Sequence, residues 1–125
     1  MKPSDLATQA ARRVNIIAHN ETLSDSEFSD AVSNLNSVLS MYSMESLLAD
    51  NGIVLPLNVD DAHTGMDDQL EWALIDILAV RLAGVYGLPI APQIAKDAQR
   101  AETNLKRWNA KPLYHKPDLV LLGLS

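Results

Sequence analysis

Cysteine is absent from this 125-residue chain. Its absence excludes disulfide bonds, a thiol nucleophile and a cysteine metal site. The first residues, MKPSDLATQAARR, also lack the apolar segment of a secretory signal peptide. We therefore expect a protein that stays in the cytoplasm, or inside a particle that is assembled there. The length suits one domain with a modest core.

Positive charge is missing from the middle of the chain. No lysine or arginine occurs in residues 14–80, and the same stretch holds twelve acidic residues. The sign reverses in residues 96–116, where six bases stand against Asp97 and Glu102. The net charge of −6 argues against tight binding of DNA by the whole surface. Two interpretations remain open: a solvated acidic face beside a basic tail, or an acidic surface combined with a basic docking end.

The usual signatures of catalysis and metal binding are lacking as well. His19, His63 and His115 fall in a turn, a loop and the tail, and none stands at metal-ligand spacing from another ligand. The five glycines are isolated, so there is no phosphate-binding loop, and no nucleophile elbow is present. The short basic pairs at 12–13 and 106–107 lack interleaved aromatic residues, which is typical of solvated helix faces. We expect no enzyme activity, no cofactor and no metal.

No apolar run has the roughly twenty residues that a membrane span requires. The strongest candidate, WALIDILAVRLAGVYG at 72–87, contains Asp76 and Arg81, about 140° apart around a helix. A helix that is apolar on most sides must be buried. It forms either the core of a small bundle or a surface partly covered by another subunit. Asp76 and Arg81 accordingly pair within the chain or with charges of another chain.

One helix start is marked clearly in the sequence. Ser24 and Glu27 fit the N-cap and N3 positions of a capping box, flanked by Leu23 and Phe28 at the two positions of a hydrophobic staple. An unbroken stripe of apolar residues at three- and four-residue steps follows. This helix either runs from 24 to about 50 or breaks near Ser43.

Apolar periodicity predicts three further helices, at 4–19 with Ser4 as N-cap, at 67–86, and at 92–108 with Pro92 in its first position. The segment IVLPL at 53–57 is expected to be extended, and as a strand it would need a partner from another chain. We therefore expect an all-α fold, an antiparallel bundle of about four helices in a body of residues 1–108. Residues 109–125 contain two prolines and no helical period, and we expect an extended C-terminal arm there.

A family resemblance rests on residues 24–107. In SDAVSNLNSVLSMYSMESLL, the positions of Tyr42, Glu45 and Leu47 match a family pattern of an aromatic residue, polar residues and a small-plus-aliphatic pair. The next helix matches the pattern Ala-x4-Leu-Ala-x-Arg-x-Ala-x2-Tyr-Gly at residues 73–87, and the alanine-rich APQIAKDAQRAETNLKR follows it. The chain resembles the head-to-tail adaptors of short-tailed phages, also called tail accessory factors or packaged-DNA stabilisation proteins. Ser46 departs from the pattern, since the family usually has glycine there.

The resemblance implies a structural virion protein that is assembled in the host cytoplasm. Adaptor copies, with twelve expected, form a ring on the portal protein, seal the packaged DNA and provide a platform for a downstream tail or nozzle protein. DNA passes through the channel without sequence-specific binding, and we expect some acids of residues 21–76 to face that channel. No membrane is involved.

Two sets of residues are candidates for contacts in such an assembly. For subunit packing we expect Trp72, Asp76, Arg81 and Tyr86. The candidates for portal binding are the arm residues Lys111, Pro112, Leu113, Tyr114, His115, Lys116, Leu119, Val120, Leu121 and Leu122. An alternative is a small cytoplasmic helical regulator that binds a protein partner through the same arm. A third hypothesis is that the chain is an enzyme, and it has the least support.

Overall fold

The structure is a computed structural model that describes the backbone of residues 1–18 and 20–123, with side chains described as far as Trp108. This part of the chain forms helices and contains no strand, which confirms the all-α prediction. The helices are α1 (Pro3–Arg13), α2 (Asp25–Met41), α3 (Glu45–Asp50), α4 (Asp68–Val85) and α5 (Pro92–Gly123).

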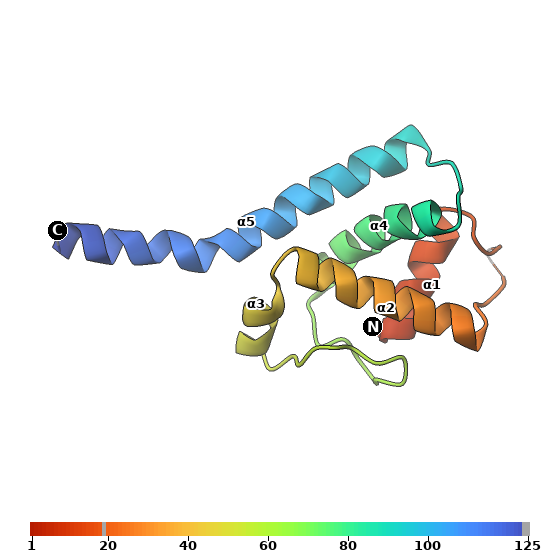
Figure 1. Cartoon of the computed structure of the whole chain (residues 1–125), viewed down its shortest axis with the longest axis horizontal. Helices are drawn as coiled ribbons and strands as arrows, with labels where there is room; N and C mark the ends of the chain where they lie inside the picture. The colour runs from red at the N-terminus through yellow and green to blue at the C-terminus, as the bar shows by residue number, and fades with distance from the viewer. Residues whose placement is uncertain (19, 124–125) are drawn as a thin grey trace.

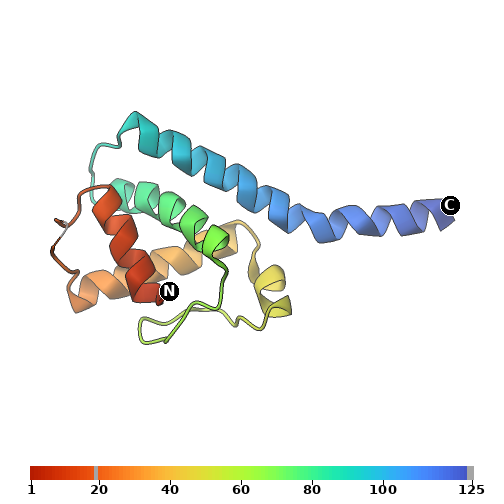
Figure 2. The same ribbon diagram turned by 180° about the vertical axis from the view of Figure 1, so that it is seen from behind.

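Helix α4 is the centre of the fold. It contacts α1, α2 and α5, and both views show α5 and α2 on opposite sides of it (Figures 1 and 2). Ten of its residues are buried, among them Leu74, Ile75 and Leu78 with no exposed surface. Truncating such a buried leucine to alanine costs about 2–5 kcal/mol of stability. Helix α4 therefore forms the core of the chain's own body, and cover of part of its surface by another subunit stays a prediction.

Helix α1 differs from the prediction at both ends. Ser4 is not its N-cap; Lys2 is, and Pro3 occupies the first helical position. A proline suits that position because its φ is already helical and its missing N–H would have no partner there. The helix stops well short of residue 19 because Asn15 adopts a left-handed conformation, with a φ of 61°, which turns the chain away.

The predicted capping box of α2 is confirmed. Ser24 Oγ accepts a hydrogen bond from the Glu27 N–H at 3.3 Å, and Glu27 Oε1 accepts one from the Ser24 N–H at 2.8 Å. Helix α2 ends at Met41, and Ser43, with a φ of 54°, separates it from α3. Of the two predicted courses for this helix, the break near Ser43 is therefore the correct one.

The segment at 53–57 is a loop and not a strand. Ile53 and Leu57 are buried against the core, so the segment belongs to the chain's own body. The side chain of Asn36 on α2 takes the place of a neighbouring strand. Its Nδ2 donates to the Leu57 carbonyl at 2.9 Å, and its Oδ1 accepts from the Leu57 N–H at 2.8 Å.

The expectation of an extended, non-helical arm is wrong for residues 109–123. Helix α5 begins at Pro92 as predicted, but it continues through Pro112 and Pro117 to Gly123. A proline inside a helix removes one backbone hydrogen bond and favours a kink, and the remaining bonds carry the helix on. Both views show α5 bending in its second half and running beyond the other helices (Figures 1 and 2).

Candidate interaction surfaces

Trp72, the first of the residues predicted to pack against another subunit, lies on the surface between α4 and α5. Its side chain is 55% exposed, which is unusual for tryptophan. Together with Trp108 it lines an open depression of about 530 Å³, whose walls also include Asp76 and Arg100. Two aromatic residues and several charged groups thus line one depression on the surface.

Asp76 has its partner within the chain. Its Oδ1 lies 2.9 Å from Nε of Arg13, an ion pair by distance, and Arg13 Nη2 donates to Asp97 Oδ2 at 3.0 Å. Arg13 thereby links α1, α4 and α5. Burial raises the pKa of Asp76, Asp97 raises it further, and Arg13 acts in the opposite direction.

Arg81 and Tyr86 lie at a second place, along the seam between α4 and α2. Arg81 Nε donates to Asn34 Oδ1 at 2.8 Å, and its Nη1 lies 3.4 Å from the sulfur of Met41. Arg81 is therefore held by α2 and does not pair with Asp76. Tyr86 at the end of α4 is 42% exposed, and its neighbour Val85 is 61% exposed. Burial of the ring, together with two acids at the start of α2, raises the pKa of Tyr86.

The residues that carry the family resemblance are mostly packing residues. Ala73, Leu78, Ala79 and Ala83 of the α4 pattern are buried. Tyr42, which ends α2, is half-buried, and its burial and the adjacent Glu102 of α5 raise its pKa. The pattern therefore describes how the helices pack and does not mark a reactive site.

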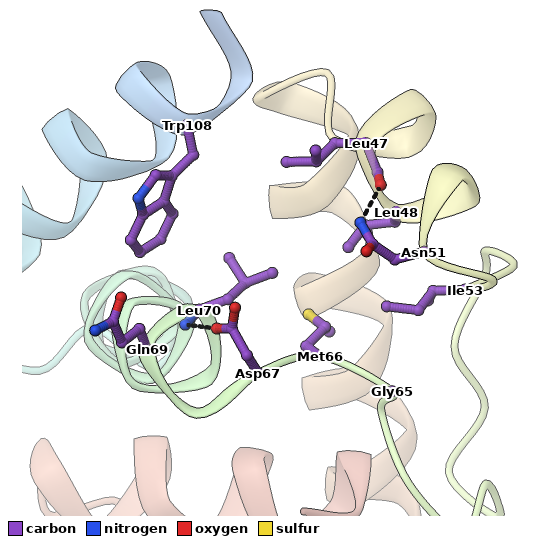
Figure 3. Close-up of a pocket in the computed structure, with 10 residues that line it drawn as sticks. All are labelled: Leu47, Leu48, Asn51, Ile53, Gly65, Met66, Asp67, Gln69, Leu70 and Trp108. Atoms are coloured by element: carbon purple, nitrogen blue, oxygen red, sulfur yellow. Dashed lines mark hydrogen bonds between the residues drawn. The ribbon is translucent and has the colours of Figure 1, made fainter. Parts of the chain in front are cut away.

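Sequence reasoning missed a pocket of about 380 Å³ at the end of the body from which α5 departs. Its apolar lining comes from α3, from the loop after it, from the start of α4 and from α5, as Figure 3 shows. The polar groups at its edge make hydrogen bonds to the backbone of the helices. Asp67 Oδ1 caps the Leu70 N–H at 2.8 Å, and Asn51 Nδ2 donates to the Leu47 carbonyl at 2.9 Å. The break that creates α3 was the only sequence signal for this pocket.

Glu71 was missed as a buried acid. Only 2% of its side chain is exposed, and its Oε2 accepts hydrogen bonds from Thr64 Oγ1 at 2.6 Å and from the amine of Met1 at 2.9 Å. The amine of Met1 also lies 2.8 Å from Nε2 of His63. In the sequence, Glu71 is one of several acids at the start of a predicted helix, and no local pattern indicates that it is buried.

The predicted portal-binding residues, from Lys111 to Leu122, have a described backbone in α5 and side chains outside the described set. His19 also lies outside the described residues. Within the described part of the chain, no group of three or more acidic, histidine or cysteine side chains is placed to hold a metal ion. The described helices include none long and apolar enough to cross a membrane.

Comparison of the chain with protein-family models, with curated proteins and with solved structures found no match in any of the three.

Proposed function

We propose that this chain is the head-to-tail adaptor of a short-tailed phage. It is a structural virion protein, assembled in the host cytoplasm, that forms a ring of twelve copies on the portal protein. The ring seals the packaged DNA and provides a platform for the next tail or nozzle protein. The body of residues 1–108 acts as the antiparallel helical bundle of the family, and residues 109–125 act as the portal-binding arm.

The observation that carries this proposal is the course of α5. Its second half runs beyond the other helices (Figure 1), and its sequence there contains LVLL at 119–122. An apolar run in a chain end that continues past the other helices is typical of a segment that binds a partner. In the resembling family, the C-terminal arm is the part that holds the portal.

The exposed aromatic residues of the body support the proposal that copies of the chain form a ring. Trp72 near the start of α4 and Tyr86 at its end are both exposed, which gives adjoining subunits two separate points of contact. A ring with an acidic inner wall lets DNA pass without adhering to it, since like charge repels phosphate. We assign that wall to part of the acids of residues 21–76.

The test is electron microscopy of this chain co-expressed with the portal protein from the same genome. We expect a ring of extra density below the portal, and its loss when residues 109–125 are deleted. The deletion leaves the packing residues Ala98, Ala101 and Leu105 of α5 in place, so its circular dichroism and cooperative melting should persist. Val54→Ser, at a loop residue that is 82% exposed, serves as a control and should attach normally.

Two results would contradict the proposal at different points. Attachment of the truncated chain would reject the role of the arm and leave the adaptor function in place. Failure of the full-length chain to bind the portal at several salt concentrations would reject the adaptor function, and a helical regulator with a different protein partner would then be favoured.

A further inference from the structure

In residues 92–108 of α5, the exposed charged side chains are all positive. Within residues 92–108 eight side chains are exposed; four of them, Lys96, Arg100, Lys106 and Arg107, are basic and none is acidic. We call these four residues the basic face. Lys96, Arg100 and Arg107 fall within about 40° of one another around a helix. The two acids of this stretch point elsewhere, since Asp97 is bound by Arg13 and Gln93, and Glu102 lies beside Tyr42.

The basic face has no electrostatic partner in the described part of its own chain. No ion pair joins any of its four residues to another described side chain. The inward side of α5 is used for packing, because Ala98, Ala101 and Leu105 are buried there. The basic face is thus a solvent-facing surface whose charge is not neutralised within the body.

The opposite side of the molecule is predominantly acidic, with Lys2 as an exposed cation beside Asp25, Asp60 and Asp61. Helices α2 and α3 and the loop of residues 51–67 contain no lysine or arginine. Their exposed acids, with that of the turn before α2, are Glu21, Asp25, Asp30, Glu45, Asp50, Asp60 and Asp67. We call this the acidic side. Figures 1 and 2 show that α2 and this loop lie across α4 from α5, with α3 beyond the end of α4.

We infer that the basic face of α5 in one copy of the chain docks on the acidic side of the next copy. This inference deepens the proposed function. It rests on that function in one respect, because it assumes that copies of the chain form a ring. Two different, complementary surfaces on opposite sides of one molecule make a heterologous, head-to-tail contact, which closes into a ring when the rotation between copies allows it.

A second copy fits the basic face better than DNA does. Four cations are few for a DNA site, and the net charge of −6 repels a duplex at long range. The same net charge does not prevent association with another copy that presents its acidic side first, because opposite local potentials orient the approach. Acids of this side that the neighbouring copy leaves uncovered remain available to line the channel.

Charge reversal tests the contact with three variants. The first reverses the basic face, with Lys96→Glu, Arg100→Glu and Arg107→Glu. The second reverses the acidic side with one change in each of its segments, Asp30→Lys, Asp50→Lys and Asp60→Lys. The third combines all six changes and so keeps the wild-type net charge. Ring formation on the portal and sedimentation of the free chain at low salt are measured for each.

We expect each single-face variant to associate with itself at least about tenfold more weakly than the wild type, because like charges then oppose each other. A mixture of the two should restore assembly, since each supplies the face that the other needs. The six-change variant should assemble alone. Circular dichroism and melting verify that each variant folds, and added salt should weaken the wild-type association.

Each other outcome is decisive. Normal rings from both single-face variants would overturn the inference and leave the adaptor function standing. Loss of duplex-DNA binding in the basic-face variant, with ring formation unchanged, would overturn it in favour of a DNA contact. Self-association through these faces by a chain that never binds the portal would support the inference and reject the proposed function. A wild-type chain that neither binds the portal nor self-associates would reject both.

Discussion

At the residue scale, two charged groups join parts of the chain that lie far apart in sequence. Glu71 connects the start of α4 to Thr64 and to the amine of Met1, and Arg13 connects α1 to Asp76 and Asp97. A buried or half-buried charge is tolerated where such partners replace its water, and it becomes costly when one partner is removed. Substitutions at these residues should therefore change the free energy of unfolding more than substitutions at the exposed acids do.

Glu71→Gln should lower the free energy of unfolding by about 2 kcal/mol. The amide leaves the amine of Met1 without its carboxylate partner and weakens the hydrogen bond from Thr64. Urea unfolding measures the change. The matched control is Glu45→Gln at an exposed site on α3, which should stay within about 0.5 kcal/mol of the wild type. Equal losses in the two variants would show that burial of Glu71 is energetically unimportant.

The pKa of Asp76 sets the sign of a pH effect on stability. Because it is raised in the folded chain above the ordinary value of 3.8, the folded state holds a proton that the unfolded state has already released. The contribution of Asp76 to stability should therefore fall as pH rises from its pKa in the unfolded chain to its raised pKa in the folded chain. We expect the difference in unfolding free energy between wild type and Asp76→Asn to decrease from about pH 3 to about pH 6. A difference that grows with pH would contradict the raised pKa.

At the scale of elements, the break between α2 and α3 is the local event that shapes the body. A continuous helix would carry residues 45–50 straight on, whereas the turn at Ser43 returns them toward α4 and forms the apolar pocket beside Trp108. The left-handed conformation of Ser43 is unfavourable for a residue with a Cβ, and packing of the buried Met44 and Leu48 holds it in place.

Ser43→Gly should stabilise the chain by up to about 1 kcal/mol, because glycine adopts a φ of 54° without steric cost. The same change at Ser33, an exposed position in the middle of α2, should instead destabilise the chain by a similar amount. Thermal unfolding of the pair separates the two effects. Destabilisation by both glycines would indicate that the turn at Ser43 carries no strain.

At the scale of the whole molecule, the separation of charge is the property with the widest consequence. The sequence already separates an acidic middle from a basic C-terminal region. Because α2 and α5 pack on opposite sides of α4, these stretches become two opposed surfaces of one body. The assembly that we propose uses both of these surfaces together with the C-terminal arm, so one small chain contacts the portal and two neighbouring copies.

Local chemistry in the sequence was sufficient to predict the all-α class, the capping box at Ser24, the start of α5 at Pro92 and the burial of the helix at 68–85. Caps, prolines and apolar periods act over a few residues, so they can be recognised without knowing the fold. The predicted Ser4 cap failed because the neighbouring Pro3 suits the first helical position better.

Tertiary structure alone decided the rest, because those features depend on residues distant in sequence. Asn36 replaced the strand partner expected for residues 53–57, and Arg13 supplied the partner of Asp76. The burial of Glu71 was hidden for the same reason, since Thr64 and the amine of Met1 reach it through the packing of the body. The order of residues determined that the chain has an acidic middle and a basic C-terminal region. The packing of α2 and α5 against α4 determined that these two stretches face in opposite directions.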